Sequence, residues 1–507
     1  MACKTESGSR NLSVRLVAVV CAAIGFAVYV NSLDCGFCFD DLSAITENQD
    51  LRPDTPWVEL LRNDFWGTPM HIEGSHKSYR PLTVATFRLN YMLHELEPLG
   101  YHLVNVLLHS AVVYLYVLLC GVVFSEVWPA LIAGLLFAVH PIHTEAVAGV
   151  VGRAETLSAI FFLLALFTYK RAALGKGWQW ISLTLLMAVS SVLSKEQGIT
   201  VVAVCFTIDV FLVQKLDLWS LLSSLTSLTP SKPLPPRWLR PLLLRGALLA
   251  VFTMAIMVVR VKIMKAELPV FTNHDNPAVT LEMPYRQLHW TYLCFVNSWQ
   301  LLNPSFLCAD WTMGTIPLIT SFNDPRNLLT VVTIVAMAML CLYGVSERAH
   351  KSVVVALSFI VFPYLPASNL FFPVGFVVAE RVLYLPSMGF CMLVGFGAWK
   401  MLAKTGSKPV KLVLVSGLAF VLLAHSSRTL VRNRDWFSDE TLFRVSVRDN
   451  PSNGKVYNNL GHEMERRGNT SFAERLFRKA GEVQPDDVGA FINLGRTLKQ
   501  LGKFEES

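Results

Sequence analysis

The chain has 507 residues, of which 53% are hydrophobic and only 16% are charged. A soluble fold of this length cannot bury so much apolar surface, so the composition excludes a soluble globular enzyme. A net charge of +7 would favour nucleic-acid binding in a soluble chain, but here the basic residues lie in short connections between apolar runs, where they report membrane topology. The sequence therefore predicts an all-α polytopic membrane protein without a nucleic-acid partner.

The N-terminus precedes the first predicted membrane span. Residues 1–15 carry Lys4, Arg10 and Arg15, and an apolar run follows from Leu16 to Val30. No small-residue cleavage site comes after this run, so we predict that the run is an uncleaved span. The segment before it, residues 1–15, is expected to be cytosolic. The membrane domain is expected to extend over residues 16–426.

A long polar and aromatic loop, residues 32–100, is expected on the luminal side. It opens with the adjacent carboxylates Asp40 and Asp41 and also contains Arg80. Two carboxylates beside a membrane are costly to bury, which favours a catalytic role for them. The alternative is that they cap the next element or simply face water.

Further apolar runs follow, and with the first they predict about eleven spans. The later ones are expected near 102–124, 128–142, 154–169, 178–194, 199–213, 243–262, 327–345, 352–365, 382–399 and 410–425. The connections on one side are basic, and the positive-inside rule makes that side cytosolic; they are Lys170–Lys176, Lys215–Arg245, Glu347–Lys351 and Lys400–Lys411. An odd number of spans places the C-terminus in the lumen, as it does the region 263–326. Arg428, Arg432 and Arg434 conflict with this assignment, because they follow the last span on its luminal side.

Polar side chains gather at the predicted luminal ends of the spans. His140, His143 and Glu145 lie within six residues and are types that bind metals. Pro141 disrupts their spacing, however, and Arg153 would repel a cation. We therefore predict a polar cluster there and no metal.

Other charged residues stand at the same ends. Lys195 and Glu196 form either a self-neutralising pair or part of an active site. Glu155 begins a span, and Arg381 precedes another. Each cation alone is typical of an interfacial anchor, but several on one face suit the phosphate of an anionic lipid.

Past Arg434 the composition changes to that of soluble amphipathic helices with a 34-residue period. The tetratricopeptide (TPR) pattern is matched by Tyr457, Leu460, Gly461, Met464, Ala473, Phe477, Ala480 and Pro485. This predicts a short α-solenoid over 436–507, with a half repeat to 453, a full repeat over 454–487 and an incomplete one over 488–507. Asn469-Thr470-Ser471 is a glycosylation sequon, usable only if the region is luminal.

Taken together, these motifs resemble the transmembrane and TPR-repeat-containing family over essentially the whole chain. The resemblance rests on Phe39-Asp40-Asp41, Ser78 to Thr83, His140 to Val147, Val151 to Glu155, Ser194 to Gly198, Ala379-Glu380-Arg381 and the repeats. It implies a GT-C glycosyltransferase fold in the endoplasmic reticulum membrane. It also implies transfer of mannose from dolichyl phosphate mannose to Ser or Thr of proteins, with cadherin-type domains, including protocadherins, as acceptors.

The residues suggest how such a transfer would proceed. An acceptor hydroxyl needs a carboxylate to take its proton, and we expect Asp40 or Asp41 to do so; their mutual repulsion would raise one pKa. The leaving phosphate needs fixed cations, for which the candidates are Arg153, Lys195, Arg80 and Arg381. The supporting polar cluster comprises His140, His143, Glu145, Glu155 and Glu196. We expect one inverting displacement and no cofactor.

Two other classes of function remain open. A non-catalytic membrane scaffold in the endoplasmic reticulum would use the repeats to hold a partner, and it does not require charges at the span ends. A transporter would place its polar residues near mid-bilayer in broken helices. The clustering of charges at one face favours the enzyme.

Overall fold

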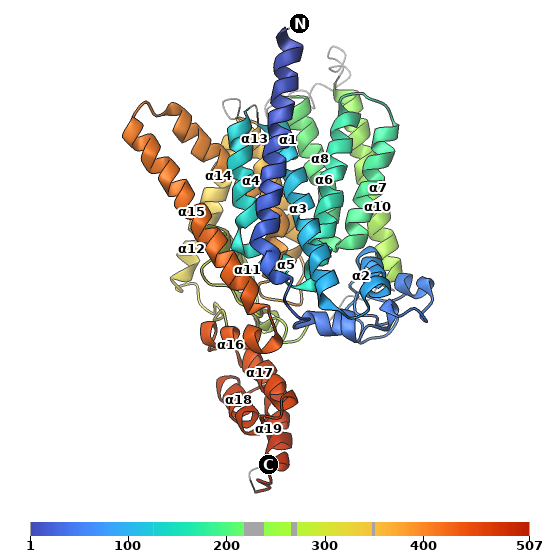
Figure 1. Ribbon diagram of the computed structural model, residues 1–507, viewed down its shortest axis with the longest axis vertical. Coiled ribbons are helices and arrows are strands. Elements are labelled where there is room, and N and C mark those ends of the chain that lie inside the picture. Colours follow the sequence, from blue (N-terminus) through green and yellow to red (C-terminus); the bar gives the residue numbers. More distant parts are fainter. Residues whose placement is uncertain (1, 125, 217–237, 265–270, 347–349, 506–507) are drawn as a thin grey trace.

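The computed structural model describes residues 2–124, 126–216, 238–264, 271–346 and 350–505. These residues form helices and no strand, and most of the helices run side by side as a bundle (Figure 1). The predicted all-α polytopic architecture is confirmed. Parts of the predicted basic connections Lys215–Arg245 and Glu347–Lys351, and of the predicted luminal region 263–326, lie outside the described residues.

Within the described residues, eight helical segments are long and apolar enough to cross a membrane. They are Asn11–Ser32, Pro98–Val123, Val150–Ala173, Glu196–Val213, Leu239–Ile263, Arg326–Val345, Glu380–Lys404 and Lys408–Asp435. A ninth is the bent pair Val127–Val139 and Pro141–Val147, whose axes differ by 48°. Two shorter apolar helices, α7 (Gln179–Ser194) and α13 (Ser352–Tyr364), coincide with the two remaining predicted spans.

The bundle is built from α1 (Ala2–Tyr29), α3 (Pro98–Val123), α4 (Val127–Val139), α6 (Arg153–Ala173), α7, α8 (Val201–Thr207), α10 (Leu239–Ile263), α12 (Arg326–Val345), α13, α14 (Tyr384–Lys404) and α15 (Lys408–Asp435). Neighbouring pairs such as α6 with α7 and α13 with α14 pack along much of their length. A Cβ atom at Gly389 of α14 would lie 2.1 Å from the carbonyl oxygen of Ala356 in α13. Only a glycine therefore permits this close approach of the two backbones.

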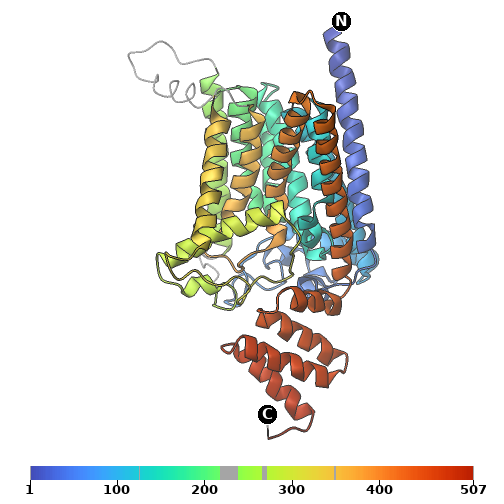
Figure 2. The same cartoon turned by 90° about the vertical axis from the view of Figure 1, so that its left-hand side faces the viewer.

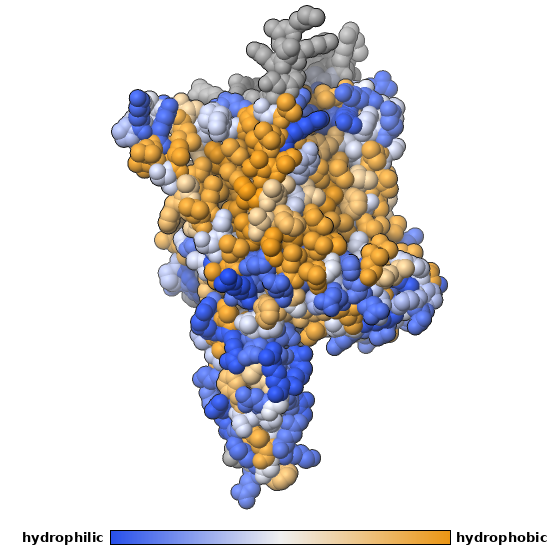
Figure 3. Space-filling model, viewed as in Figure 1, coloured by the Kyte–Doolittle hydropathy of each residue, from blue (hydrophilic) through white to orange (hydrophobic). Residues whose placement is uncertain are grey.

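The two termini lie at opposite ends of the bundle, as an odd number of spans requires (Figure 2). An apolar belt surrounds the middle of the face shown in Figure 3, and hydrophilic side chains cover the C-terminal helices below it. We call the end from which those helices project the C-terminal end of the bundle. The connections α6–α7 and α14–α15 lie at the other end (Figure 1).

Two helices occur where only irregular loops were expected. Helix α2 (Pro81–His94) lies within the segment 32–100 and begins with Pro81, a residue favoured in the first helical turn. Its Val84 and Phe87 are buried, while Leu89 and Met92 are exposed. Helix α11 (Tyr285–Leu302) crosses the C-terminal end of the bundle (Figure 2). Both mix apolar and polar residues and are shorter than or at the lower limit of a typical span, so average hydropathy did not reveal them.

The last membrane helix continues beyond its predicted end at 425. Helix α15 reaches Asp435, and the guanidinium Nη1 of Arg432 lies 3.2 Å from the Asp435 carboxylate. Arg432 is fully buried. Its charge therefore belongs to a packed helix end.

Four helices extend from α15: α16 (Asp439–Asp449), α17 (Gly454–Arg466), α18 (Thr470–Val483) and α19 (Val488–Gln500). Their shared core includes Leu460, Phe477 and Ala480. A Cβ atom at Gly461 would lie 2.5 Å from the Phe477 ring, so the close contact of α17 and α18 requires a glycine there. The repeat boundaries given above stay predictions.

Candidate active site

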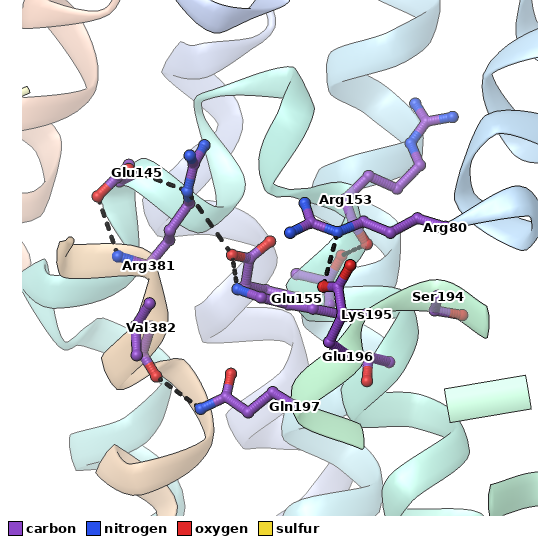
Figure 4. Close-up of polar contacts among 12 residues, drawn as sticks. Arg80, Glu145, Arg153, Glu155, Ser194, Lys195, Glu196, Gln197, Arg381 and Val382 are labelled. Atoms are coloured by element: carbon purple, nitrogen blue, oxygen red, sulfur yellow. Dashed lines mark hydrogen bonds and ion pairs between the residues drawn. The ribbon is translucent and has the colours of Figure 1, made fainter. Parts of the chain in front are cut away.

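A chain of ion pairs lies at the C-terminal end of the bundle. Nη2 of Arg381 lies 2.9 Å from Oδ2 of Asp40, and its Nε lies 3.3 Å from Oε1 of Glu145 and 3.8 Å from Oε1 of Glu155. The Lys195 ammonium contacts the same oxygen of Glu155. Three carboxylates and two cations thus form one connected group. Figure 4 shows four of its members: Glu145, Glu155, Lys195 and Arg381.

The members of this group come from five separate places in the chain. Asp40 lies in the segment after α1, and Glu145 lies in α5 (Thr144–Val147). Glu155 is in the first turn of α6, and Lys195 separates α7 from η7 (Glu196–Thr200). Arg381 belongs to η11 (Glu380–Leu383) just before α14. Because successive spans are antiparallel, only the packed bundle brings these ends together.

A second ion group lies beside the first. Nε of Arg80, the residue before α2, is 3.0 Å from Oε2 of Glu196, and the Arg80 guanidinium stacks over the Phe65 ring at 4.9 Å. Nη2 of Arg260 in α10 lies 3.3 Å from the other oxygen of Glu196. Glu196 therefore pairs with two arginines and is the residue after Lys195. Figure 4 shows its contact with Arg80.

Asp41 has a different environment from its neighbour. Its side chain is buried, and its two oxygens accept hydrogen bonds from the backbone N–H groups of Val151 at 2.8 Å, Val150 at 3.2 Å and Cys38 at 3.2 Å. Burial raises the pKa of Asp41 from 3.8 to about 7, although these N–H groups oppose the shift. Asp41 thus caps η6 (Val150–Gly152) at the start of the α6 span.

Asp40 is the carboxylate of the pair that reaches the cluster. Its side chain is 25% exposed and forms an ion pair with Arg381, whose side chain is also 25% exposed. A part-exposed carboxylate can accept a proton from an arriving hydroxyl group. The adjacent guanidinium can stabilise negative charge on a phosphate. The arrangement is therefore suited to transfer from a phosphate donor to a hydroxyl acceptor.

Arg153 is not part of the cluster, although it begins the same helix as Glu155. Its guanidinium points away from Lys195 (Figure 4) and is fully buried. It donates hydrogen bonds to the Asn105 side chain at 2.9 Å, the Asn90 side chain at 2.6 Å, and the carbonyl oxygens of Thr86 at 3.3 Å and Tyr101 at 2.9 Å. These bonds join α6 to α2 and α3 and occupy most of its donors.

The two histidines of the predicted polar cluster are packed inside the bundle. Nε2 of His140 lies 3.1 Å from the Leu301 carbonyl oxygen, and Nε2 of His143 lies 2.8 Å from the Ser387 hydroxyl oxygen. Both are fully buried among aromatic rings. Glu145 turns instead toward Arg381. Among the residues with described positions, no three His, Cys, Asp or Glu side chains are grouped to hold a metal ion.

Comparison with known proteins identifies the family. Residues 265–338 match the family model described as "Protein O-mannosyl-transferase TMTC, DUF1736". The chain is 47% identical over 505 residues to "Protein O-mannosyl-transferase TMTC3" of Homo sapiens, an alignment covering 98% of this chain and 54% of that protein. It is 42% identical to Tmtc3 of Drosophila melanogaster (99% of this chain, 58% of that protein) and 36% identical to TMTC2 of Homo sapiens (92% and 62%). The chain belongs to the TMTC family.

The predicted family is thereby confirmed, and the chain is more similar to human TMTC3 than to human TMTC2. This TMTC chain spans about half the length of the curated TMTC3 proteins that it matches.

The segment matched by the TMTC model contacts the candidate site. It includes α11, α12 and the stretch between them. In that stretch the Cys308 N–H and the Trp311 indole N–H donate to Oε1 of Glu380 at 2.6 and 3.1 Å. Glu380 is buried and directly precedes Arg381. The family-specific segment therefore helps to position the guanidinium that faces Asp40.

Three residues of the TMTC site escaped the sequence reasoning: Glu380, Arg260 and Gln197. Gln197 Nε2 donates to the carbonyl oxygens of Pro363 and of Val382, the latter at 3.2 Å, and so ties η7 to η11. Glu380 and Gln197 lie within the motifs Ala379-Glu380-Arg381 and Ser194 to Gly198. The sequence indicates roles only for the charged residues beside them. Arg260 lies in the last turn of a predicted span, where a cation is typical and attracts no attention.

Proposed function

We propose that this protein is a protein O-mannosyltransferase of the endoplasmic reticulum membrane. It takes mannose from dolichyl phosphate mannose and transfers it to Ser or Thr hydroxyl groups of luminal proteins, with cadherin-type domains as acceptors. The relatives that match nearly all of this chain are named protein O-mannosyl-transferases. The family's GT-C fold is expected to hold here as well.

The observation that carries the proposal is the Asp40–Arg381 pair. A sugar transfer from a lipid phosphate to a hydroxyl group needs a proton acceptor beside a fixed cation. Asp40 and Arg381, whose side-chain atoms are 2.9 Å apart, supply both in one part-exposed place. They lie at the end of the bundle where the charged span ends meet, within reach of a donor whose lipid tail lies in the membrane.

In the proposed reaction Asp40 accepts the proton of the acceptor hydroxyl as its oxygen attacks the anomeric carbon of mannose. The bond between that carbon and the phosphate oxygen breaks, and dolichyl phosphate leaves. The anomeric carbon of the transferred mannose is inverted. Arg381 and Lys195 are close enough to each other, through Glu155, to share the phosphate charge. Arg80 and Arg260 stand behind them at Glu196. Arg153 has no part in this assignment.

Membranes containing the full chain test the proposal, with radiolabelled dolichyl phosphate mannose and a cadherin-repeat acceptor. The wild type is expected to label the acceptor, and Asp40→Asn is expected to abolish the labelling. Asp34→Asn is the matched control, because Asp34 is an exposed carboxylate of the same segment outside the ion-pair group. If neither the wild type nor Asp34→Asn labels any acceptor, the enzyme is excluded and the membrane scaffold remains.

A further inference from the structure

The segment that carries Asp40 is held from two sides by different parts of the protein. On one side Asp41 accepts the N–H groups of Val150 and Val151, at the start of α6. On the other side Oδ1 of Asp439, in the first turn of α16, accepts the N–H of Phe39 at 2.8 Å. Asp40 thus lies between an anchor in the bundle and an anchor in the C-terminal helices.

The backbone at Phe39 depends on the second anchor. Phe39 has φ of +55°, in the left-handed region that residues with side chains seldom adopt. Its ring packs edge-on against Phe443 of α16 with centroids 5.9 Å apart, and the neighbouring Cys38 thiol donates to the Trp436 carbonyl oxygen. An unfavourable conformation persists only where the surroundings impose it, and here α16 and the residues before it do so.

Asp439 is itself connected to the next helix. Its Oδ2 lies 2.9 Å from Nη2 of Arg466 in α17, and Asp439 is 7% exposed. The buried Asp439 carboxylate therefore links Phe39 to both α16 and α17.

The C-terminal helices also reach the other member of the Asp40–Arg381 pair. Nζ of Lys455 in α17 lies 2.9 Å from Oδ2 of Asp310, and the Asn453 side chain donates to the Asp310 carbonyl oxygen at 3.1 Å. Asp310 stands in the stretch whose Cys308 and Trp311 hold Glu380, next to Arg381. Both partners of the pair are therefore connected to α16 and α17, by independent routes.

We propose that the C-terminal helices set the position of Asp40, with Asp439 as the positioning residue. A displacement of α16 and α17, such as an acceptor protein bound on the helices would cause, moves the backbone at Phe39 and with it the Asp40 carboxylate. The consequence for transfer rests on the proposed function, whereas the contact itself does not. Asp439 does not touch the reacting atoms; it acts through Phe39.

Three variants of the full chain separate this role from general stability. Asp439→Ala removes the acceptor of the Phe39 N–H, whereas Asp439→Asn keeps an oxygen in the same place and loses only the charge that faces Arg466. Glu440→Ala is the matched control, because Glu440 lies in the same first turn of α16 and pairs with Arg444 and Arg467 instead.

Hydrogen exchange at the Phe39 amide measures the contact without any need for activity. Exchange is expected to rise in Asp439→Ala and to stay near the wild-type rate in Asp439→Asn and Glu440→Ala. In the transfer assay, Asp439→Ala is expected to lose about tenfold in kcat with an unchanged KM for the donor, because misplacement of a catalytic group affects the reaction step. Asp439→Asn should restore most of that loss.

Unchanged exchange in Asp439→Ala, or equal losses of kcat in Asp439→Ala and Glu440→Ala, would overturn the proposal. Raised exchange with a normal kcat would also overturn it, while the proposed function would stand. A wild type that transfers no mannose, yet shows the expected exchange, would instead overturn the proposed function and leave the contact established.

Discussion

The guanidinium of Arg381 connects Asp40 to Glu145, with Nη2 2.9 Å from the Asp40 carboxylate and Nε 3.3 Å from the Glu145 carboxylate. Asp41, one residue further along the chain, instead accepts hydrogen bonds from three backbone N–H groups. The adjacent carboxylates therefore have separate surroundings: Asp40 faces the ion-pair group around Arg381, and Asp41 fixes the segment to the bundle.

This separation predicts that Asp41→Ala lowers stability, not the intrinsic rate of transfer. Loss of the carboxylate leaves buried N–H groups of Val150 and Val151 without an acceptor, at a cost of about 1–3 kcal/mol for each such group. The expected result is a lower unfolding temperature of the purified protein in detergent, while Asp40→Asn unfolds like the wild type. An Asp41→Ala protein with wild-type stability and no transfer would reverse the two assignments.

The raised pKa of Asp41 predicts a dependence of stability on pH. Its pKa is 3.8 in an unfolded chain and about 7 in the folded protein, chiefly because of burial. Between these values the folded state holds a proton that the unfolded state has lost, so this group's contribution to stability is complete below pH 4 and is lost as pH rises to 7. The unfolding temperature should fall over this range in the wild type.

Asp41→Asn cannot titrate and supplies the control for this measurement. Its unfolding temperature should change less between pH 4.5 and 7 than that of the wild type, whatever its absolute value. Parallel curves for the two proteins would show that Asp41 is ionised throughout the range in the folded state.

Arg153 and Arg381 predict opposite outcomes for the same substitution. Arg153→Lys keeps the charge but cannot donate to Asn90, Asn105, Thr86 and Tyr101 at once, so it should lower the unfolding temperature and the yield of folded protein. Arg381→Lys keeps a cation near Asp40 but loses the planar group that contacts three carboxylates. We expect it to reduce kcat about 10- to 100-fold with a smaller change in stability. Transfer assays normalised to the amount of folded protein distinguish an effect on stability from an effect on kcat. Equal losses of kcat in the two variants would indicate that Arg153 binds the donor phosphate, as the sequence predicts.

The sequence predicts the spans well because a membrane span needs a continuous run of apolar residues, which local hydropathy detects. Each predicted span coincides with an apolar helical segment among the described residues. It predicts the roles of the charges less well. Arg153 and Arg381 both stand beside a glutamate at a span end, and only the rotation of each helix in the packed bundle directs one guanidinium to α2 and α3 and the other to Asp40.

Sequence alone also could not distinguish the roles of the adjacent residues Asp40 and Asp41. Their spacing indicates a pair, and sequence alone left both as the base. The turn at Phe39, imposed by residues about 400 positions away in α16, decides which carboxylate faces the cluster. Helix α2 escaped for a related reason, because its buried face is defined by contacts with distant segments and not by a long apolar run.

The sequon at Asn469 predicts which side of the membrane contains the site. Asn469 is exposed at the start of α18. Helix α18 is one of the helices that project from the C-terminal end of the bundle (Figure 1), the end that also contains the Asp40–Arg381 pair. If that end is luminal, Asn469 carries a glycan in cells, because glycosylation occurs only on the luminal side. Endoglycosidase treatment should increase the gel mobility of the wild type and have no effect on Asn469→Gln. Protease added to intact microsomes should remove a tag before residue 1 and spare a tag after residue 507. An unglycosylated Asn469 together with digestion of the C-terminal tag would place Asp40 in the cytosol, away from luminal acceptors, and would contradict the proposed reaction.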